Sequence, residues 1–146
     1  MLRLLCVLLL SATCSAAQEV RPYRIVGDAV PEPFAPSGDA ARGRAMLAAR
    51  DPANCILCHA APAELTKSGV RFSGNLAPGL DGAGARWTAG QLRLRLADGM
   101  RLNPDTIMPS YYRTKGLVEV AAALRGKPIM TAQQIEDLIA YLLTLK

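Results

Sequence analysis

The sequence has few of the side chains that build most metal and redox sites. Its 146 residues include one histidine, four cysteines and one tryptophan. A structural zinc site needs four ligands, commonly including a second Cys or His pair, so a single histidine gives zinc little support. The chain also has no long basic run, which argues against a nucleic-acid partner. Its net charge of +5 then indicates either a solvated surface or a face that docks an acidic protein.

The sequence also lacks a hydrophobic run long enough to span a membrane. Its leucine-rich run covers residues 4–10, far short of the roughly 20 residues that a spanning helix needs. Arg3 before this run and "SAA" after it are typical of a secretory signal peptide. We therefore expect residues 1–17 to be removed and the protein to be periplasmic. A lipoprotein anchored at Cys14 is less well supported, because a threonine precedes that cysteine.

Four prolines fall within residues 18–37. This segment is therefore predicted to be an extended N-terminal arm and not a packed element. It would serve either as a linker or as an arm that wraps around a partner. Residues 38–146 then form one domain, which is long enough to bury a core of its own.

Three helices are predicted in that domain. Residues 39–50 are alanine-rich and offer Asp39 as the N-cap. Capping boxes at residues 88–91 ("TAGQ") and 131–134 ("TAQQ") begin two further helices. The period of two in "QLRLRL" would suit a strand, but the cap favours a helix. The last helix is predicted to run to the C-terminus with one apolar stripe, formed by Ile135, Leu138, Ile139 and Leu142.

The stretch "CILCH" places two thiols beside the only imidazole of the chain, as Cys55, Cys58 and His59. Without the signal peptide, these are the only cysteines left. A c-type haem uses this spacing, because the thiols bond to the porphyrin's vinyl groups and the histidine then lies below the iron. We predict one haem c, covalently held by Cys55 and Cys58, with His59 as an axial ligand.

Two other uses of a CxxC pair fit the sequence less well. A thioredoxin-like redox pair belongs to a strand-to-helix turn in an α/β pattern, and this sequence shows no such alternation. A structural disulfide between Cys55 and Cys58 remains an alternative for an exported protein. It would leave His59 without a role.

Met108 is the candidate for the second axial ligand. The stretch "NPDTIMPSYYR" holds it in a loop that Pro104 and Pro109 stiffen. A thioether is a soft, neutral ligand that raises the reduction potential of the iron. A surface or packing role is the alternative for Met108. The other methionines of the exported chain fit core packing; they are Met46, Met100 and Met130.

From about residue 39 to residue 146 the sequence resembles the class I cytochromes c. The likeness rests on "CILCH", the stretch "APGLDGAGAR", the Met-Pro loop and the closing amphipathic helix. It implies an all-α fold in which three or more helices and long loops surround one covalently bound haem. It also implies that the first and last helices cross, with Gly43 and Leu47 against Leu138 and Tyr141.

The same resemblance implies roles for residues of the glycine-rich stretch. The carbonyl of Pro78 would accept a hydrogen bond from the ring of His59, and Leu80 would pack on the haem. Arg86 would contact a haem propionate. We add the indole N–H of the adjacent Trp87 as a candidate for the same contact. An alanine precedes Pro78 where the family usually has glycine.

Residues 84–113 and 124–145 closely resemble the SoxX family of mono-haem cytochromes. That resemblance implies a haem-containing partner, SoxA, in the SoxAX L-cysteine S-thiosulfotransferase of bacterial thiosulfate oxidation. The chain would accept electrons while thiosulfate is joined to a cysteine of a carrier protein. It would then pass them to a soluble cytochrome c.

A free-standing electron carrier with no enzymatic partner is the alternative function. The proline-rich arm and "SYYR" favour a partner, since exposed tyrosines and an arginine are typical interface anchors. Packing of Tyr111 and Tyr112 around the haem edge is the other interpretation of that stretch. Nothing in the sequence resembles a site that makes bonds to a substrate, so we expect the chemistry on sulfur to lie on the partner.

Overall fold

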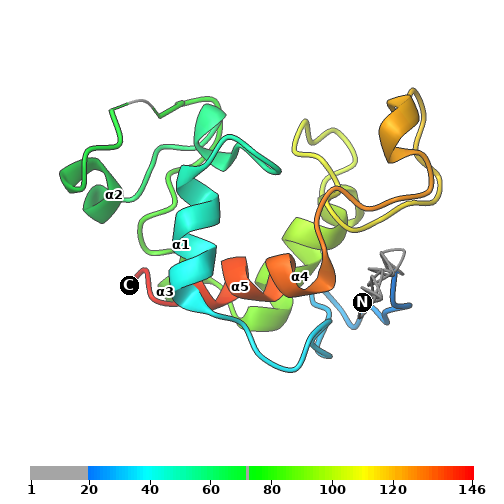
Figure 1. Ribbon diagram of the computed structural model, residues 1–146. Coiled ribbons are helices and arrows are strands. Elements are labelled where there is room, and N and C mark those ends of the chain that lie inside the picture. Colours follow the sequence, from blue (N-terminus) through cyan, green and yellow to red (C-terminus); the bar gives the residue numbers. More distant parts are fainter. Residues whose placement is uncertain (1–19, 72) are drawn as a thin grey trace, which may run out of the picture.

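The computed structural model describes residues 20–71 and 73–146, so the predicted signal peptide lies outside the described residues. Three single 3₁₀ turns, Cys55–Leu57, Gly99–Arg101 and Ala122–Leu124, accompany five α-helices. The α-helices are α1 (Ala40–Ala48), α2 (Ala63–Lys67), α3 (Ala83–Arg86), α4 (Ala89–Asp98) and α5 (Ala132–Leu142). Within the described ranges, strand pairing is limited to isolated bridges. The predicted all-α fold is confirmed (Figure 1). None of the helices in these ranges has the length and apolar character needed to cross a bilayer.

Each of the three predicted helices begins at its predicted cap. The side chain of Asp39 accepts hydrogen bonds from the backbone N–H groups of Ala41 and Arg42. Thr88 and Thr131 each form a complete capping box with the glutamine three residues later, so "QLRLRL" is helical. Caps of this kind stabilise a helix by about 1 kcal/mol. Local signals therefore fix where these helices begin.

The last helix ends before the C-terminus, contrary to the prediction. α5 stops at Leu142, and the backbone N–H of Gly84 donates to Leu145 O at 2.8 Å. Lys146 Nζ donates to Gly84 O, also at 2.8 Å. The end of the chain therefore pairs with α3 instead of continuing the helix.

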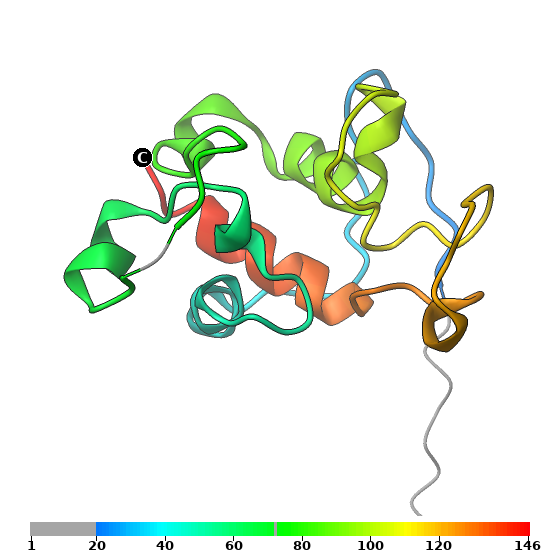
Figure 2. The same ribbon diagram turned by 90° about the horizontal axis from the view of Figure 1, so that it is seen from above.

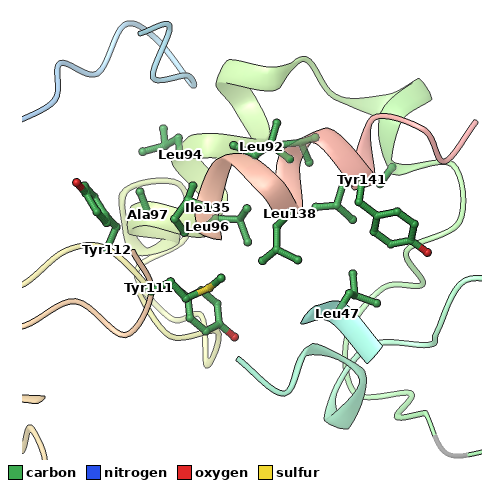
Figure 3. Close-up of a cluster of buried hydrophobic side chains, with 14 of the residues drawn as sticks. Leu47, Leu92, Leu94, Leu96, Ala97, Tyr111, Tyr112, Ile135, Leu138 and Tyr141 are labelled. Atoms are coloured by element: carbon green, nitrogen blue, oxygen red, sulfur yellow. The ribbon is translucent and has the colours of Figure 1, made fainter. Parts of the chain in front are cut away.

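α5 is the central helix of the core, with α1 on one side and α4 on the other (Figures 1 and 2). Gly43 permits the crossing of α1 and α5, because a Cβ at this position would collide with the carbonyl oxygen of Asp137. Leu47 and Leu138 are buried in the core, as expected for the crossing. The whole predicted stripe of α5 is buried and packs with leucines of α4 (Figure 3).

Irregular backbone forms residues 20–37, the described part of the predicted arm. The expectation of an unpacked element is wrong, because Val30 and Phe34 are buried in the core. The backbone N–H of Phe34 donates to Glu136 Oε1 on α5, at 2.9 Å. These apolar residues lie among prolines and follow neither helical nor strand periodicity, so the sequence pattern did not reveal their burial.

Candidate functional site

The "CILCH" stretch forms a tight turn that holds both thiols and the imidazole on one short segment. Asn54, just before the 3₁₀ turn, has a left-handed backbone with φ 47°. The backbone N–H groups of Cys58 and His59 both donate to Cys55 O, at 3.3 and 3.1 Å. Both cysteines are free and half-buried. The structure therefore does not have the disulfide that the sequence left open.

The environment of Cys55 does not suit a redox-active thiol. Burial is the main cause that raises the pKa of this thiol to about 11. Reactive cysteines in thioredoxin-like sites have lowered pKa values instead, because the thiolate is the nucleophile. A thioether carries no charge, so conversion of Cys55 to a thioether is compatible with its burial.

The imidazole of His59 is oriented by a backbone carbonyl. Its Nδ1 lies 2.7 Å from Pro78 O, the hydrogen bond that the family resemblance implies. A carbonyl oxygen only accepts, so Nδ1 carries the proton and Nε2 keeps its lone pair. Partners of this kind fix the ring of a metal-ligating histidine and raise its basicity. His59 is therefore prepared to coordinate a metal through Nε2.

The glycine-rich stretch supplies that carbonyl by running beside the "CILCH" segment. The backbone N–H of Gly74 donates to Ile56 O at 2.8 Å, and that of Ala77 donates to Cys58 O at 2.9 Å. A Cβ at Gly74 would collide with Leu57 O, so the approach requires glycine. These backbone hydrogen bonds fix the position from which Pro78 reaches the imidazole.

The Met108 loop, residues 102–113, is tied to the C-terminal part of α4. The backbone N–H of Tyr111 donates to Leu96 O at 3.0 Å. Met108 is half-buried and packs against the core. Its backbone N–H donates to Thr106 Oγ1 at 3.2 Å. The loop that carries Met108 is therefore anchored to α4.

Tyr111 joins the Met108 loop to the cysteine segment. Its hydroxyl donates to Ala53 O at 3.3 Å, two residues before Cys55, and points out of the leucine cluster (Figure 3). Burial raises the pKa of Tyr111, and negative charge on Cys55 or Cys58 would raise it further, because the three side chains are neighbours. The thiols and the methionine loop thus border the same side of the core.

The other methionines occupy different environments. Met130 is fully buried, as its predicted core role requires, and Met46 on α1 is half-buried. The prediction of core packing is wrong for Met100, which is 37% exposed. α4 ends at Asp98 and a 3₁₀ turn follows, so Met100 does not continue the apolar face of the helix.

Three of the remaining predicted site residues lie on the loop that supports His59 or directly after it. Leu80 is half-buried against the core. Arg86 donates to Asp81 O at 2.6 Å and to Gly79 O at 3.0 Å. The guanidinium of Arg86 lies 4.9 Å from the ring centroid of Trp87, and that of Arg95 lies 4.8 Å from it. The sequence reasoning did not single out Arg95 as a member of this cationic group.

A haem fits the donor groups that these segments assemble. The chain provides two adjacent thiols, an imidazole with a fixed tautomer and a half-buried thioether. Several half-buried apolar side chains also pack against the core and would gain from an apolar cover. They include Ala53, Cys55, Val70, Leu80 and Met108.

The sequence reasoning missed a buried polar group behind the Met108 loop. Asp98 is buried at the end of α4, where Ser110 Oγ donates to its Oδ1 at 3.3 Å. Arg113 Nη1 lies 3.2 Å from the same oxygen. Tyr111 and Tyr112 between them are buried, so packing is the correct interpretation of "SYYR" and exposed tyrosine anchors are not. No local pattern marks Asp98, because both of its partners lie on the following loop, outside the helix that carries it.

Comparison with known proteins relates the chain to one protein family and to a solved structure. A family model described as cytochrome c matches residues 40–146. The crystal structure of SoxXA from P. pantotrophus is similar at 35% identity with a TM-score of 0.73. That match covers 85% of this chain and 94% of the other. No curated protein matches the sequence.

Proposed function

The chain belongs to the cytochrome c family, and on that premise we propose how its residues hold the haem and where its electrons come from. It is a SoxX-type electron-transfer subunit with one haem c. We propose that Cys55 and Cys58 form the thioether bonds, with His59 and Met108 as the axial ligands. The observation that carries this assignment is the hydrogen bond from His59 Nδ1 to Pro78 O, which leaves Nε2 for the iron.

The haem, when bound, supplies a one-electron redox centre whose potential depends on its axial ligands and surroundings. The chain contributes orientation and electrostatics. Pro78 holds the imidazole, and Met108 supplies a neutral sulfur that favours the ferrous state. Leu80 would pack on the haem, and Arg86 with the indole N–H of Trp87 would bind a propionate, where a cation stabilises the carboxylate.

The proposed partner is a SoxA-like haem subunit, because the similar crystal structure is that of SoxXA. Joining thiosulfate to a cysteine thiol of a carrier protein forms a sulfur–sulfur bond and releases two electrons and a proton. This chain would take the electrons singly and pass them to a soluble cytochrome c. In this assignment both exported cysteines and the sixth iron position would be occupied, so bond formation to sulfur would belong on the partner.

Reduction kinetics of the purified proteins test this function. Thiosulfate together with the carrier protein should reduce the haem of this chain only when the SoxA-like subunit is present. Co-purification of that subunit from periplasm should accompany the effect. A haem that is reduced equally well without the partner would favour the free-standing carrier instead.

Export is the remaining part of the proposal. Residues 1–17 would be removed during passage to the periplasm, and the arm from residue 18 would remain. Intact-mass measurement of the haem-containing protein tests both points, since it reports the new N-terminus and the added haem together. A mass that retains residues 1–17 contradicts cleavage.

A further inference from the structure

We propose that the N-terminal arm, residues 20–37, is a positioning element for the Met108 loop and acts on it through Tyr112. This inference rests on the proposed role of Met108 as an axial ligand. The arm thereby becomes part of the electron-transfer site, although it lies far from that site in the sequence.

Tyr112 is the point where the arm meets the loop. It is fully buried, and its ring stacks on Phe34 with centroids 4.4 Å apart and planes 17° apart. Tyr23 lies beside both rings, at 5.4 Å from Phe34 and 6.3 Å from Tyr112. The backbone N–H of Arg21 donates to the hydroxyl of Tyr112 at 3.0 Å. Every one of these contacts comes from the arm.

The arm is itself fixed to α4, which anchors the Met108 loop, and to α5. Arg93 on α4 and Glu136 on α5 form a buried ion pair at 2.6 Å. Arg93 Nη1 donates to Val30 O at 2.7 Å, and Glu136 Oε1 accepts from the backbone N–H of Phe34 at 2.9 Å. A buried pair with its hydrogen bonds satisfied is rigid, and removing one partner leaves an uncompensated charge. Phe34 is therefore held in a fixed place against Tyr112.

Tyr112 is supported from two directions. Its backbone N–H donates to Ala97 O of α4 at 3.4 Å, which holds the main chain. The side chain depends on the arm, because the stacked ring of Phe34 covers it. Tyr112 lies four residues after Met108, so loss of its support increases the fraction of molecules in which the loop has moved away.

Ligand competition measures that fraction. An added ligand such as imidazole binds the iron only when Met108 is displaced, so its apparent affinity rises with the displaced fraction. Phe34→Leu keeps an apolar side chain but removes the aromatic stack. We expect it to raise the apparent affinity of the ferric holoprotein for imidazole at least about threefold, as the energy of an aromatic pair implies. The near-infrared sulfur-to-iron band should weaken in parallel.

Leu47→Ala is the matched control, because Leu47 is buried on α1 and belongs neither to the arm nor to the cluster of three aromatic rings. Urea unfolding should show that it destabilises the protein at least as much as Phe34→Leu. Its imidazole affinity should stay within about twofold of the wild type, a difference of about 0.4 kcal/mol. Equal affinities in the two variants would overturn the positioning role and leave Phe34 as ordinary core.

Met108→Ala separates this inference from the one on which it rests. It should abolish the near-infrared band and raise the imidazole affinity beyond that of Phe34→Leu. If Met108→Ala leaves both unchanged, Met108 is not the ligand and the proposed site fails together with the positioning role. If Met108→Ala responds and Phe34→Leu does not, only the positioning role fails.

Discussion

The two proposed axial ligands, His59 and Met108, differ in how firmly the surrounding protein holds them. His59 has its ring fixed through Nδ1 by a backbone carbonyl, which no substitution of a side chain removes directly. Met108 has its backbone tied to Thr106, while its thioether is only half-buried. The methionine is therefore the residue through which the potential can be changed with the least damage to the fold.

Replacement of Met108 by histidine should lower the reduction potential and keep the covalent haem. Imidazole replaces a thioether that favours ferrous iron, and axial-ligand identity is a principal determinant of potential. Potentiometric titration measures the change. Met100→Ala is the control, because Met100 is exposed and lies beyond the end of α4. A near-infrared band that is lost in Met100→Ala and kept in Met108→Ala would assign the ligand to Met100.

Asp98 should contribute strongly to the free energy of unfolding, although it is not one of the proposed haem-binding residues. Asp98→Asn leaves Arg113 without its counterion in a mostly buried position and weakens the contact with Ser110. The expected loss is about 2–4 kcal/mol of unfolding free energy, measured by urea denaturation of the holoprotein. Asp105→Asn, in the exposed part of the Met108 loop, should leave the unfolding free energy within about 0.5 kcal/mol of the wild type. Equal losses in both variants would exclude a special role for the buried carboxylate.

At the scale of helices, the sequence predicted the elements whose ends are marked by short-range capping signals. Capping boxes define α4 and α5 because donor and acceptor lie three residues apart. α2 and α3 have five and four residues. Helices this short are not stable by propensity alone and depend on tertiary contacts. Their existence was therefore not predictable from local pattern.

The candidate site and its support also contain a part that local sequence predicts and a part that it does not. "CILCH" is contiguous, so its three donor groups could be identified from the sequence, and Met108 followed from the need for a second ligand. The ion pair between Arg93 and Glu136 joins residues far apart in the chain. Periodicity cannot report such a pair, since each partner reads as an ordinary charged residue on a helix surface.

From the close crossing of α1 and α5 we predict that any side chain larger than that of Gly43 lowers stability. Gly43→Ala places a Cβ against the carbonyl of Asp137, so the helices must separate. We expect a loss of about 3 kcal/mol or more of unfolding free energy. Gly99→Ala is the matched control, because no atom lies within 4 Å of its added Cβ and φ is −58°. That control should be neutral or slightly stabilising in thermal unfolding, and similar losses in both would refute the steric argument.

The same pair of helices should make stability depend on acid. Burial alone would raise the pKa of Asp137, but hydrogen bonds from Arg42, Gln133 and the backbone of Asp39 hold it below its ordinary value. A lowered folded-state pKa means that its stabilisation is complete above the ordinary aspartate pKa of about 3.9 and is lost as the pH falls through the folded value. Unfolding free energies from pH 6 downward, to about pH 2, should therefore fall more steeply in the wild type than in Asp137→Asn. Parallel curves would contradict this linkage.

At the scale of the whole molecule, the haem would add apolar surface to the protein core. Half-buried apolar side chains of the cysteine segment and of the Met108 loop, such as Cys55 and Met108, pack against the core. Burial of apolar surface stabilises by roughly 25 cal/mol per Å². A cofactor that binds only the folded chain adds its binding energy to stability.

The double substitution Cys55→Ser with Cys58→Ser should therefore abolish more than redox activity. Without covalent attachment, we expect the far-ultraviolet circular dichroism to lose most of its helical signal and the thermal transition to lose cooperativity. Ser110→Ala, which keeps both thiols, should retain the haem and a cooperative transition at a modestly lower temperature. An apo-protein with the same melting temperature as the holoprotein would show that the protein core is sufficient by itself.

The central place of α5 sets the order of events during biogenesis. α5 is the last of the described helices along the chain, yet both α1 and α4 pack against it. In the proposed export the chain would cross the membrane from its N-terminus, so the helix on which α1 and α4 pack would arrive last. Long-range closure of this kind is slow. Until then Cys55 lies outside the core, with the lower pKa of an ordinary exposed thiol. In the interval between arrival of the cysteine segment and docking of α5, the Cys55 thiol would therefore be most reactive toward haem attachment.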